Sequence, residues 1–181
     1  MRDILIGGME KQDIVISDYD PLWPEKFRRH AAIISQALGQ KALVIEHVGS
    51  TSVPGLAAKP IIDIDVVVED SSNETAYLPA FLAAGYVLRV REPDWHEHRM
   101  LRTPQLDVHV HIFSRGCVEV ARHLAFRSRL QSHAEDRLRY EALKRRLAKE
   151  DWLDMNAYAR AKSEVIEEII AHALAHSSNV A

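Results

Sequence analysis

The stretch that decides the fold is HVGSTSVPGLAAKPIIDID, residues His47–Asp65. A short apolar run just before it, Ala42–Ile45, predicts a strand. The small residues Gly49–Ser52 interrupt that strand, and Pro54-Gly55 predict a turn. A second apolar run, Ile61–Val68, predicts the next strand. The rest of the chain is expected to be organised around these two strands and the loop between them.

Two acids, Asp63 and Asp65, interrupt the second apolar run. Side chains two residues apart in a strand point the same way, so both carboxylates are predicted on one face, about 7 Å apart along the strand. Aspartate is depleted in strands, and two like charges this close destabilise each other unless a cation or a proton lies between them. The pair therefore indicates a functional site.

The composition limits the class of protein. With 181 residues the chain can form one ordinary domain with a real core, and its 47% hydrophobic and 27% charged residues are typical of a soluble globular protein. A formal net charge of −3 provides no basic footprint, so nucleic acid is not expected as a partner. The single cysteine, Cys117, excludes a disulfide framework and a cysteine zinc site within the chain.

No apolar run approaches the ~20 residues of a membrane span. Residues 1–13 also lack the apolar segment of a signal peptide. We therefore expect a cytoplasmic protein with no membrane partner.

The order of the predicted elements indicates an α+β fold. Apolar spacing, turn residues and caps predict strands at Ile14–Ser17, Tyr86–Arg91, His98–Thr103 and Leu106–Phe113, and helices at Trp23–Leu38, 74–84, 119–131, 134–149 and 155–175. Pro79 is expected to kink or delay the second helix, and Asp154 is a candidate cap for the last. We expect a single domain over residues 1–181, with a sheet-containing core at 14–115 and a helical C-terminal part at 116–176.

The loop and the two acids together are typical of a phosphate and metal site. Glycine and small hydroxyl residues after a strand, here Gly49–Ser52, let backbone N–H groups approach a phosphate closely. Lys59, in the same loop, is the best candidate among the basic residues for binding it. The carboxylates of Asp63 and Asp65 offer the oxygen ligands that Mg²⁺ prefers. The alternative is an ordinary tight turn followed by a strand with a polar outer face.

Two histidine-containing segments can complete such a site. In the strand Asp107–Phe113, alternation places Asp107, His109 and His111 on one face, where they can be metal ligands or a general base. The segment Asp94–His98 adds His96 and His98, which with His109 and His111 can form a histidine-rich transition-metal site. The alternatives are the solvent-facing side of an amphipathic strand and a loop with exposed histidines.

The helical region carries many basic residues. Arg122 and Arg129 are seven residues apart and share a helix face, and arginines of this kind can bind a triphosphate through bidentate hydrogen bonds. The same set includes Lys144, Arg145, Arg146 and Lys162, which are also candidates for binding a triphosphate. Most members of the set are instead expected at the solvated surface, paired with acids at helical spacing.

These motifs carry a family resemblance. The string EHVGSTSVPGLAAKPIIDID resembles the signature of the GrpB family, which belongs to the DNA polymerase-β-like nucleotidyltransferase superfamily. VHVHIF resembles its later His-x-His strand, and HLAFRSRLQSHAEDRLRYEALKRRLA and Tyr158-x-x-x-Lys162 resemble its helical C-terminal part. The resemblance runs from about Ile14 to Ala173. It implies a nucleotidyltransferase-like fold, with a mixed sheet, packed helices and a helical C-terminal part.

By that resemblance, Gly49 and Ser50 contact phosphate, and Asp63 and Asp65 bind metal. The superfamily usually has a third acid on a later strand, where this chain offers His109 and His111. We expect a metal-dependent nucleotidyltransferase that uses Mg²⁺, Mn²⁺ or another divalent metal and moves a nucleotidyl group from an NTP to a small-molecule or protein acceptor. Gly49, Ser50, Thr51, Ser52 and Lys59 are the expected nucleotide-binding residues. The alternatives are a catalytically silent nucleotide- or anion-binding regulatory module and a histidine-metal hydrolase.

Overall fold

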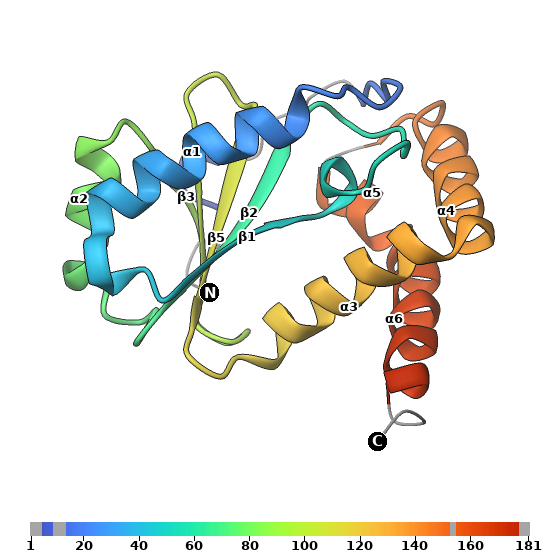
Figure 1. Ribbon diagram of the computed structural model, residues 1–181. Coiled ribbons are helices and arrows are strands. Elements are labelled where there is room, and N and C mark those ends of the chain that lie inside the picture. Colours follow the sequence, from blue (N-terminus) through green and yellow to red (C-terminus); the bar gives the residue numbers. More distant parts are fainter. Residues whose placement is uncertain (1–4, 9–13, 153–154, 178–181) are drawn as a thin grey trace.

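The computed structural model describes residues 5–8, 14–152 and 155–177. Its helices are α1 Trp23–Leu38, α2 Leu78–Ala83, α3 Val118–Ser132, α4 Ala134–Leu147, α5 Met155–Arg160 and α6 Ser163–Ser177. Its 3-10 turns are η1 Gly39–Lys41, η2 Ser50–Ser52 and η3 Glu74–Ala76. Its strands are β1 Val44–Val48, β2 Ile62–Val68, β3 Val87–Glu92, β4 His98–Arg102 and β5 Val108–Ser114. The predicted α+β class, with a mixed sheet and a helical C-terminal part, is confirmed (Figure 1).

The strands form one mixed sheet in the order β1-β2-β5-β4-β3. The pair β2 and β5 is parallel, and the other neighbouring pairs are antiparallel. In the parallel pair Asp63 lies opposite His109 and Asp65 lies opposite His111. The two polar faces expected from alternation therefore meet at the centre of the sheet.

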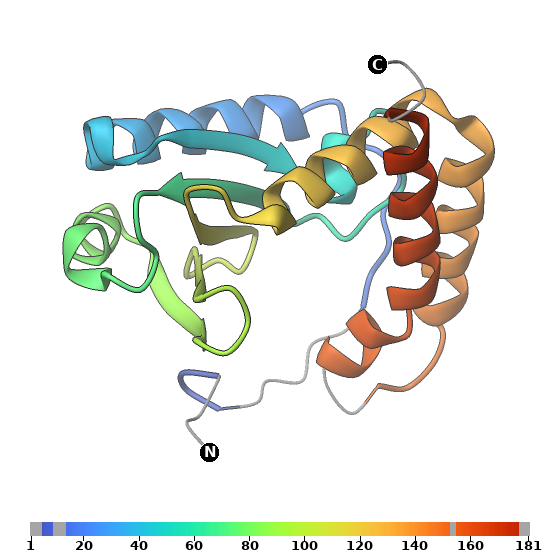
Figure 2. The ribbon, with the colours of Figure 1, turned by 90° about the horizontal axis from the view of Figure 1, so that it is seen from below.

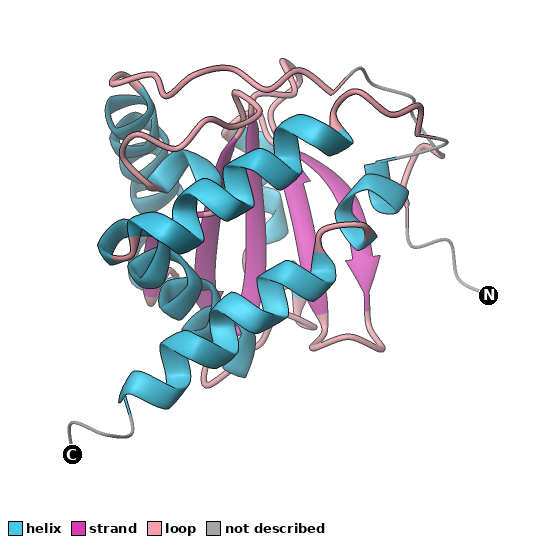
Figure 3. Cartoon of the chain, turned by 90° about the vertical axis from the view of Figure 1, so that its right-hand side faces the viewer, coloured by secondary structure: helices cyan, strands magenta, loops and turns pink. Residues whose placement is uncertain are grey.

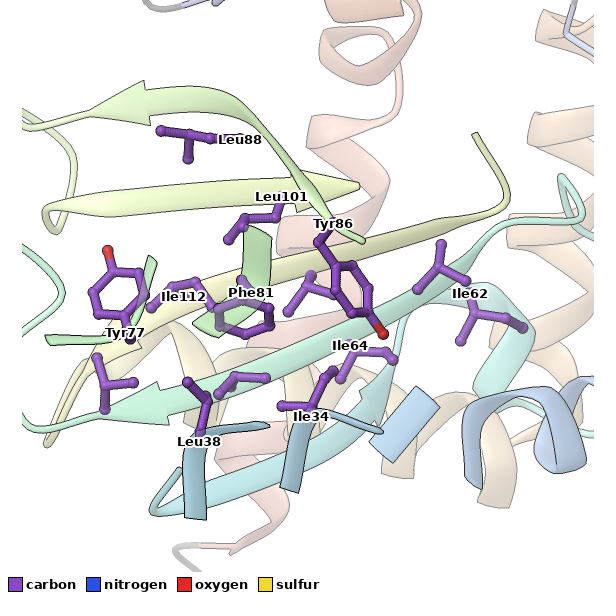
Figure 4. Packing of buried hydrophobic residues seen from close by; sticks show 14 of the residues in the cluster. Ile34, Leu38, Ile62, Ile64, Tyr77, Phe81, Tyr86, Leu88, Leu101 and Ile112 are labelled. Carbon is purple, nitrogen blue, oxygen red and sulfur yellow. The ribbon is translucent and has the colours of Figure 1, made fainter. Parts of the chain in front are cut away.

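One face of the sheet is covered by α1 and α2 (Figure 1). Ile62, Ile64 and Ile112 point to this side and are fully buried. Figure 4 shows Ile34 and Leu38 of α1 facing β2, with aromatic rings of the α2 region beside them. This dry layer holds β2 and β5 rigidly, so the polar residues of the opposite face are presented on a fixed support.

The helical part joins the opposite face through α3 and lies against the loop after β1 (Figure 2). A second apolar cluster links that loop to the helices; its buried members are Val53, Leu56, Phe126, Leu130, Tyr140, Ile169 and Ile170. Figure 3, viewed from this side, shows helices in front of the strands. The position of the glycine-containing loop is therefore set by both the sheet and the helices.

Three predicted elements differ from the observed ones. Ile14–Ser17 is not a strand: Ser17 makes one isolated bridge, to Ala58, and the ladder cannot continue because Pro60 has no N–H to donate. The helix predicted at 74–84 divides into η3 and α2, with Pro79 in the first turn of α2. The helix predicted at 155–175 breaks at Ala161-Lys162, and Asp154 lies outside the described residues.

Within the described ranges, no helix has both the length and the apolar character that crossing a bilayer requires.

Candidate functional site

The site begins at a close approach between Gly49 and Asp63. Gly49 has φ 69° and ψ −172°, a backbone conformation that is essentially restricted to glycine. A Cβ added there would lie 2.7 Å from Oδ2 of Asp63. The glycine therefore serves two needs at once, the turn out of β1 and the space that the Asp63 carboxylate occupies.

The hydroxyl residues after Gly49 have different roles. A hydrogen bond joins the side chains of Ser50 and Tyr140. Thr51 is buried, and its Oγ1 is 3.0 Å from Nε2 of His47. Ser52 donates to the carbonyl of Gly49 at 2.6 Å and so closes the turn. Ser50 and Thr51 line a cavity in front of this loop, whereas the Ser52 hydroxyl does not.

Asp63, His109 and His111 form a cluster that can hold a metal ion. One ligand atom from each of the three lies within 4.8 Å of the others. Nδ1 of His109 is 3.5 Å and Nε2 of His111 is 3.6 Å from the same oxygen of Asp63, Oδ1. Adjacent strands in parallel register bring these side chains together, since Asp63 and His109 are direct partners and His111 follows two residues later.

The cluster changes the pKa values of Asp63 and His111. Burial alone would raise the pKa of Asp63, but His109 and His111 outweigh it and hold that pKa well below its usual range. Burial opposes protonation of His111, but the nearby Asp63 carboxylate raises its pKa overall. Asp63 is therefore an ionised acceptor between two imidazoles.

Asp65 lies on the same face but does not join the cluster. It is fully buried, and its Oδ2 is 2.7 Å from Nδ1 of His123 on α3. Its other oxygen, Oδ1, is buried with no hydrogen-bond partner among the described residues. Asp107 is also outside the cluster, because it binds Lys26 at 2.7 Å and Thr103 at 2.6 Å. Neither acid completes an all-carboxylate site with Asp63.

The chemistry of this donor set fits a divalent cation. Asp63 supplies carboxylate oxygen, and His109 and His111 supply imidazole nitrogen. A mixed oxygen and nitrogen set suits first-row transition ions better than Mg²⁺, which prefers oxygen ligands throughout. The partnerless buried Oδ1 of Asp65 is a further sign that this face accommodates a positive charge.

A cavity of about 130 Å³ opens beside Asp63. Its lining consists of Ile16, Gly49, Ser50, Thr51, Ala58, Lys59, Ile61, Asp63, His109, Phe126, Tyr140, Lys144, Tyr158 and Lys162. The sheet contributes the acid, and the loop and the helical part contribute the lysines.

The lysines of this cavity are buried and crowded. Burial and the Lys162 ammonium lower the pKa of Lys59 to about 8, and burial lowers that of Lys162 to about 8. Burial, with Lys162 nearby, lowers the pKa of Lys144 to about 7. Lys144 and Lys162 are thus exceptions to the expectation that most of the basic residues lie at the solvated surface: Lys144 is 2% exposed and donates to the carbonyl of Ala57. Three buried ammonium groups with lowered pKa values in one cavity favour the binding of a polyanion there.

Each lysine of this cavity lies near a tyrosine ring. Nζ of Lys144 is 4.9 Å from the Tyr140 ring, and Nζ of Lys162 is 4.4 Å from the Tyr158 ring. Nζ of Lys59 is 5.4 Å from that same Tyr158 ring. The repeated spacing Tyr-x-x-x-Lys was the signal in the sequence for these residues. Lysine beside tyrosine stabilises a cation without neutralising it, so its charge stays available.

The remaining candidates lie outside the cavity. Arg122 pairs with Glu119 and Glu167, and Arg129 pairs with Asp136, so both guanidinium groups are already engaged. His96 is 3.9 Å from Glu119. His98 contacts His111 at 3.0 Å but is not part of the metal cluster. The histidine-rich site of the hydrolase alternative is thus not assembled by the described side chains.

Comparisons with known proteins agree over most of the chain. The profile of the family described as GrpB protein matches residues 13–172. A UPF0157 protein of Streptomyces coelicolor is 53% identical over 169 residues, which cover 93% of this chain and 89% of that protein. One of Halalkalibacterium halodurans is 47% identical over 175 residues, with 96% and 90% covered.

A solved structure is similar as well. The crystal structure of the conserved protein GrpB from Enterococcus faecalis superimposes with a TM-score of 0.80 at 35% sequence identity. The match covers 90% of this chain and 99% of that one. From its sequence and its fold, the chain belongs to the GrpB protein family.

Proposed function

We propose that the protein is a metal-dependent nucleotidyltransferase that moves a nucleotidyl group from an NTP to a small-molecule or protein acceptor. The observation that carries this proposal is that Asp63, the Gly49–Thr51 loop and the lysines Lys59, Lys144 and Lys162 line one cavity. An acid that can hold a cation and a set of cations that can hold phosphates are the two halves of a nucleoside triphosphate site.

The loop and the lysines would bind the phosphates. Gly49 and Ser50 line the cavity, and Ser50 offers a hydroxyl to a phosphate oxygen there. Lys59 comes from the sheet side, and Lys144 and Lys162 come from the helical part, so their ammonium groups surround the anion from two directions. Their charge would compensate the pyrophosphate that leaves when the acceptor oxygen bonds to the α-phosphorus and the bridging P–O bond breaks.

Asp63, His109 and His111 would hold the divalent metal. When bound, the ion would orient the α-phosphate, activate the acceptor hydroxyl and neutralise developing charge. Mg²⁺ is the usual partner of nucleoside triphosphates, but the two imidazoles favour an ion such as Mn²⁺, which accepts nitrogen ligands as well. The hydrogen bond between the buried Asp65 and His123 would tie strand β2 to α3 beside this site.

Transfer of label from ATP tests the proposal. Purified protein with Mn²⁺ or Mg²⁺ would be incubated with ATP labelled at the α- or at the γ-phosphate, with fractionated cell extract as the source of acceptor. We expect transfer of the α-label by the wild type and by Asp107→Asn, whose carboxylate lies outside the cavity. Asp63→Asn should lose the activity, since it loses the charge that both imidazoles face.

Transfer of the γ-label would indicate a kinase and would contradict the proposal. Absence of any α-label transfer, with ATP binding intact by calorimetry, would instead favour a silent nucleotide-binding regulatory module of the same fold. A specific observation favours that second candidate: Asp65 is bound to His123, and Asp107, the acid beside the later strand β5, is bound to Lys26, so neither joins Asp63 in holding a metal ion.

A further inference from the structure

A line of polar side chains leads away from the metal cluster through His111. Nδ1 of His111 is 3.0 Å from Nε2 of His98 on β4. Nδ1 of His98 is in turn 2.7 Å from Oε2 of Glu92, the last residue of β3. The line therefore runs from a carboxylate near the surface, through two imidazoles, to the side of His111 opposite Asp63.

The chemistry of the line determines where the protons lie. A carboxylate only accepts, so Nδ1 of His98 carries the proton that it donates to Glu92. Neutral His98 then has a bare Nε2, which accepts from Nδ1–H of His111. In neutral His111 the lone pair is then on Nε2, the atom that faces Asp63. For neutral imidazoles, the proton position on each ring thus determines the proton position on the next.

Packing holds His98 in this role. It is 5% exposed, and its ring stacks on Phe113 with centroids 4.9 Å apart, while His111 meets it edge to edge with centroids 5.2 Å apart. Trp95 contacts it edge-on at 5.2 Å. Because water has little access to the ring, its two nitrogens must be satisfied by Glu92 and His111. The ring cannot turn away without breaking both the stack and the hydrogen bonds.

We propose that Glu92 and His98 are positioning residues that hold His111 as its Nδ1–H tautomer and so present a bare Nε2 to a metal ion bound at Asp63. The proposal rests on the metal site proposed above and adds two residues that do not touch the ion. Carboxylate–histidine pairs behind a histidine ligand orient the ring and raise its basicity.

Loss of the carboxylate has a definite consequence. Without Glu92, His98 is free to carry its proton on Nε2 and donate to His111. His111 would then carry its own proton on Nε2, where it faces Oδ1 of Asp63 in place of a metal ion. Removing Glu92 should thus reverse both tautomers and close the metal site while the cluster residues themselves stay unchanged.

The experiment uses the full chain and two readouts. Long-range ¹H–¹⁵N correlation spectra of metal-free protein report which imidazole nitrogen of His111 carries the proton, with His111→Gln as the assignment control. Titration with Co²⁺ reports affinity, and its visible absorption reports nitrogen coordination. The variants are Glu92→Ala, Glu92→Gln, whose amide carbonyl can still accept from His98, and Glu69→Ala, which removes an exposed acid paired with Arg115.

We expect Nδ1–H on His111 in the wild type, in Glu92→Gln and in Glu69→Ala, and Nε2–H in Glu92→Ala. Co²⁺ affinity should fall about 10- to 100-fold in Glu92→Ala alone. An unchanged tautomer in Glu92→Ala, or Nε2–H in the wild type, would overturn the positioning role. Absence of Co²⁺ binding by the wild type would instead overturn the metal site, and the tautomer spectra would still decide the role of Glu92 and His98.

Discussion

At the scale of single residues, Lys144 is the most informative group in the cavity. It is almost completely buried, and the charged groups that act on it are Lys162, Glu141, Arg145 and Lys59. Cations outnumber the single acid among them, so charging Lys144 is unfavourable until an anion enters. The ammonium group of Lys144 is thus buried beside other cations at the place where the proposed phosphates would bind.

Lys144 predicts a pH dependence of both stability and anion binding. Burial lowers its pKa from 10.5 to about 7, so between these values the unfolded chain binds more protons than the folded one. The free energy of unfolding should therefore rise as pH increases through this window. Binding of inorganic triphosphate should weaken over the same range by about 10-fold or more, because a hydrogen bond to a charged group contributes roughly 1.5–3 kcal/mol.

Urea denaturation and calorimetry at pH 6.5 and pH 9 would measure the two trends. Lys144→Met is the matched variant, since it keeps a long apolar stem without the charge. It should be at least as stable as the wild type at pH 6.5 and show a shallower pH slope, yet bind triphosphate more weakly. A variant that binds triphosphate as well as the wild type at pH 6.5 would remove Lys144 from the anion site.

At the scale of elements, the decisive contact joins the loop after β1 to strand β2. The backbone of Gly49 fits against the Asp63 side chain with no room for a Cβ atom. Strand β2 is at the same time buried on its other face through Ile62 and Ile64. It therefore cannot shift to relieve a clash, and any strain at Gly49 must disturb Asp63 or the loop.

Gly49→Ala should both destabilise the fold and impair the site. The glycine-only conformation should cost about 1–3 kcal/mol for alanine, and the new methyl group would displace the Asp63 carboxylate. We expect a lower urea midpoint and weak or absent Co²⁺ binding by calorimetry. Gly55→Ala is the matched control, because Gly55 also has positive φ but no atom within 4 Å of the added Cβ. Metal binding lost equally in both variants would point to general loop strain instead.

At the scale of the whole molecule, the cavity lies where the sheet-containing core meets the helical part. Lys59 and Asp63 belong to the first, and Tyr140, Lys144 and Lys162 to the second. The apolar cluster around Val53 and Leu56 joins the two parts just beside it. An anion in the cavity would therefore add a further link between them.

Hydrogen exchange should detect that link. Addition of inorganic triphosphate at about 100 times its dissociation constant should stabilise the fold by about 2.7 kcal/mol. We expect slower amide exchange at residues 49–59 and in α4 and α6 together. The same protein with Lys162→Met is the control. Protection confined to one of the two parts would contradict a site between them.

The sequence by itself determined the local structure and much of the site. Apolar periodicity placed β2, β5 and α1 within one or two residues. The small residues after β1 and the alternating acids and histidines identified Gly49, Asp63, His109 and His111, because these patterns depend on chain geometry alone. Lys59 was also identified, since it lies in the same loop as the glycine.

Only the tertiary structure decided which of these residues meet. The parallel pairing of β2 and β5 brings Asp63 to His109 across 46 residues of chain, and no local pattern encodes that register. Packing of α3 against the sheet brings His123 within hydrogen-bond distance of Asp65. Packing of α4 buries Lys144, although most basic residues of that helix were expected at the surface. Charge and desolvation depend on what the rest of the fold places around a group. Of the two acids that suggested a metal pair, Asp63 remains a candidate ligand and Asp65 is a buried partner of His123.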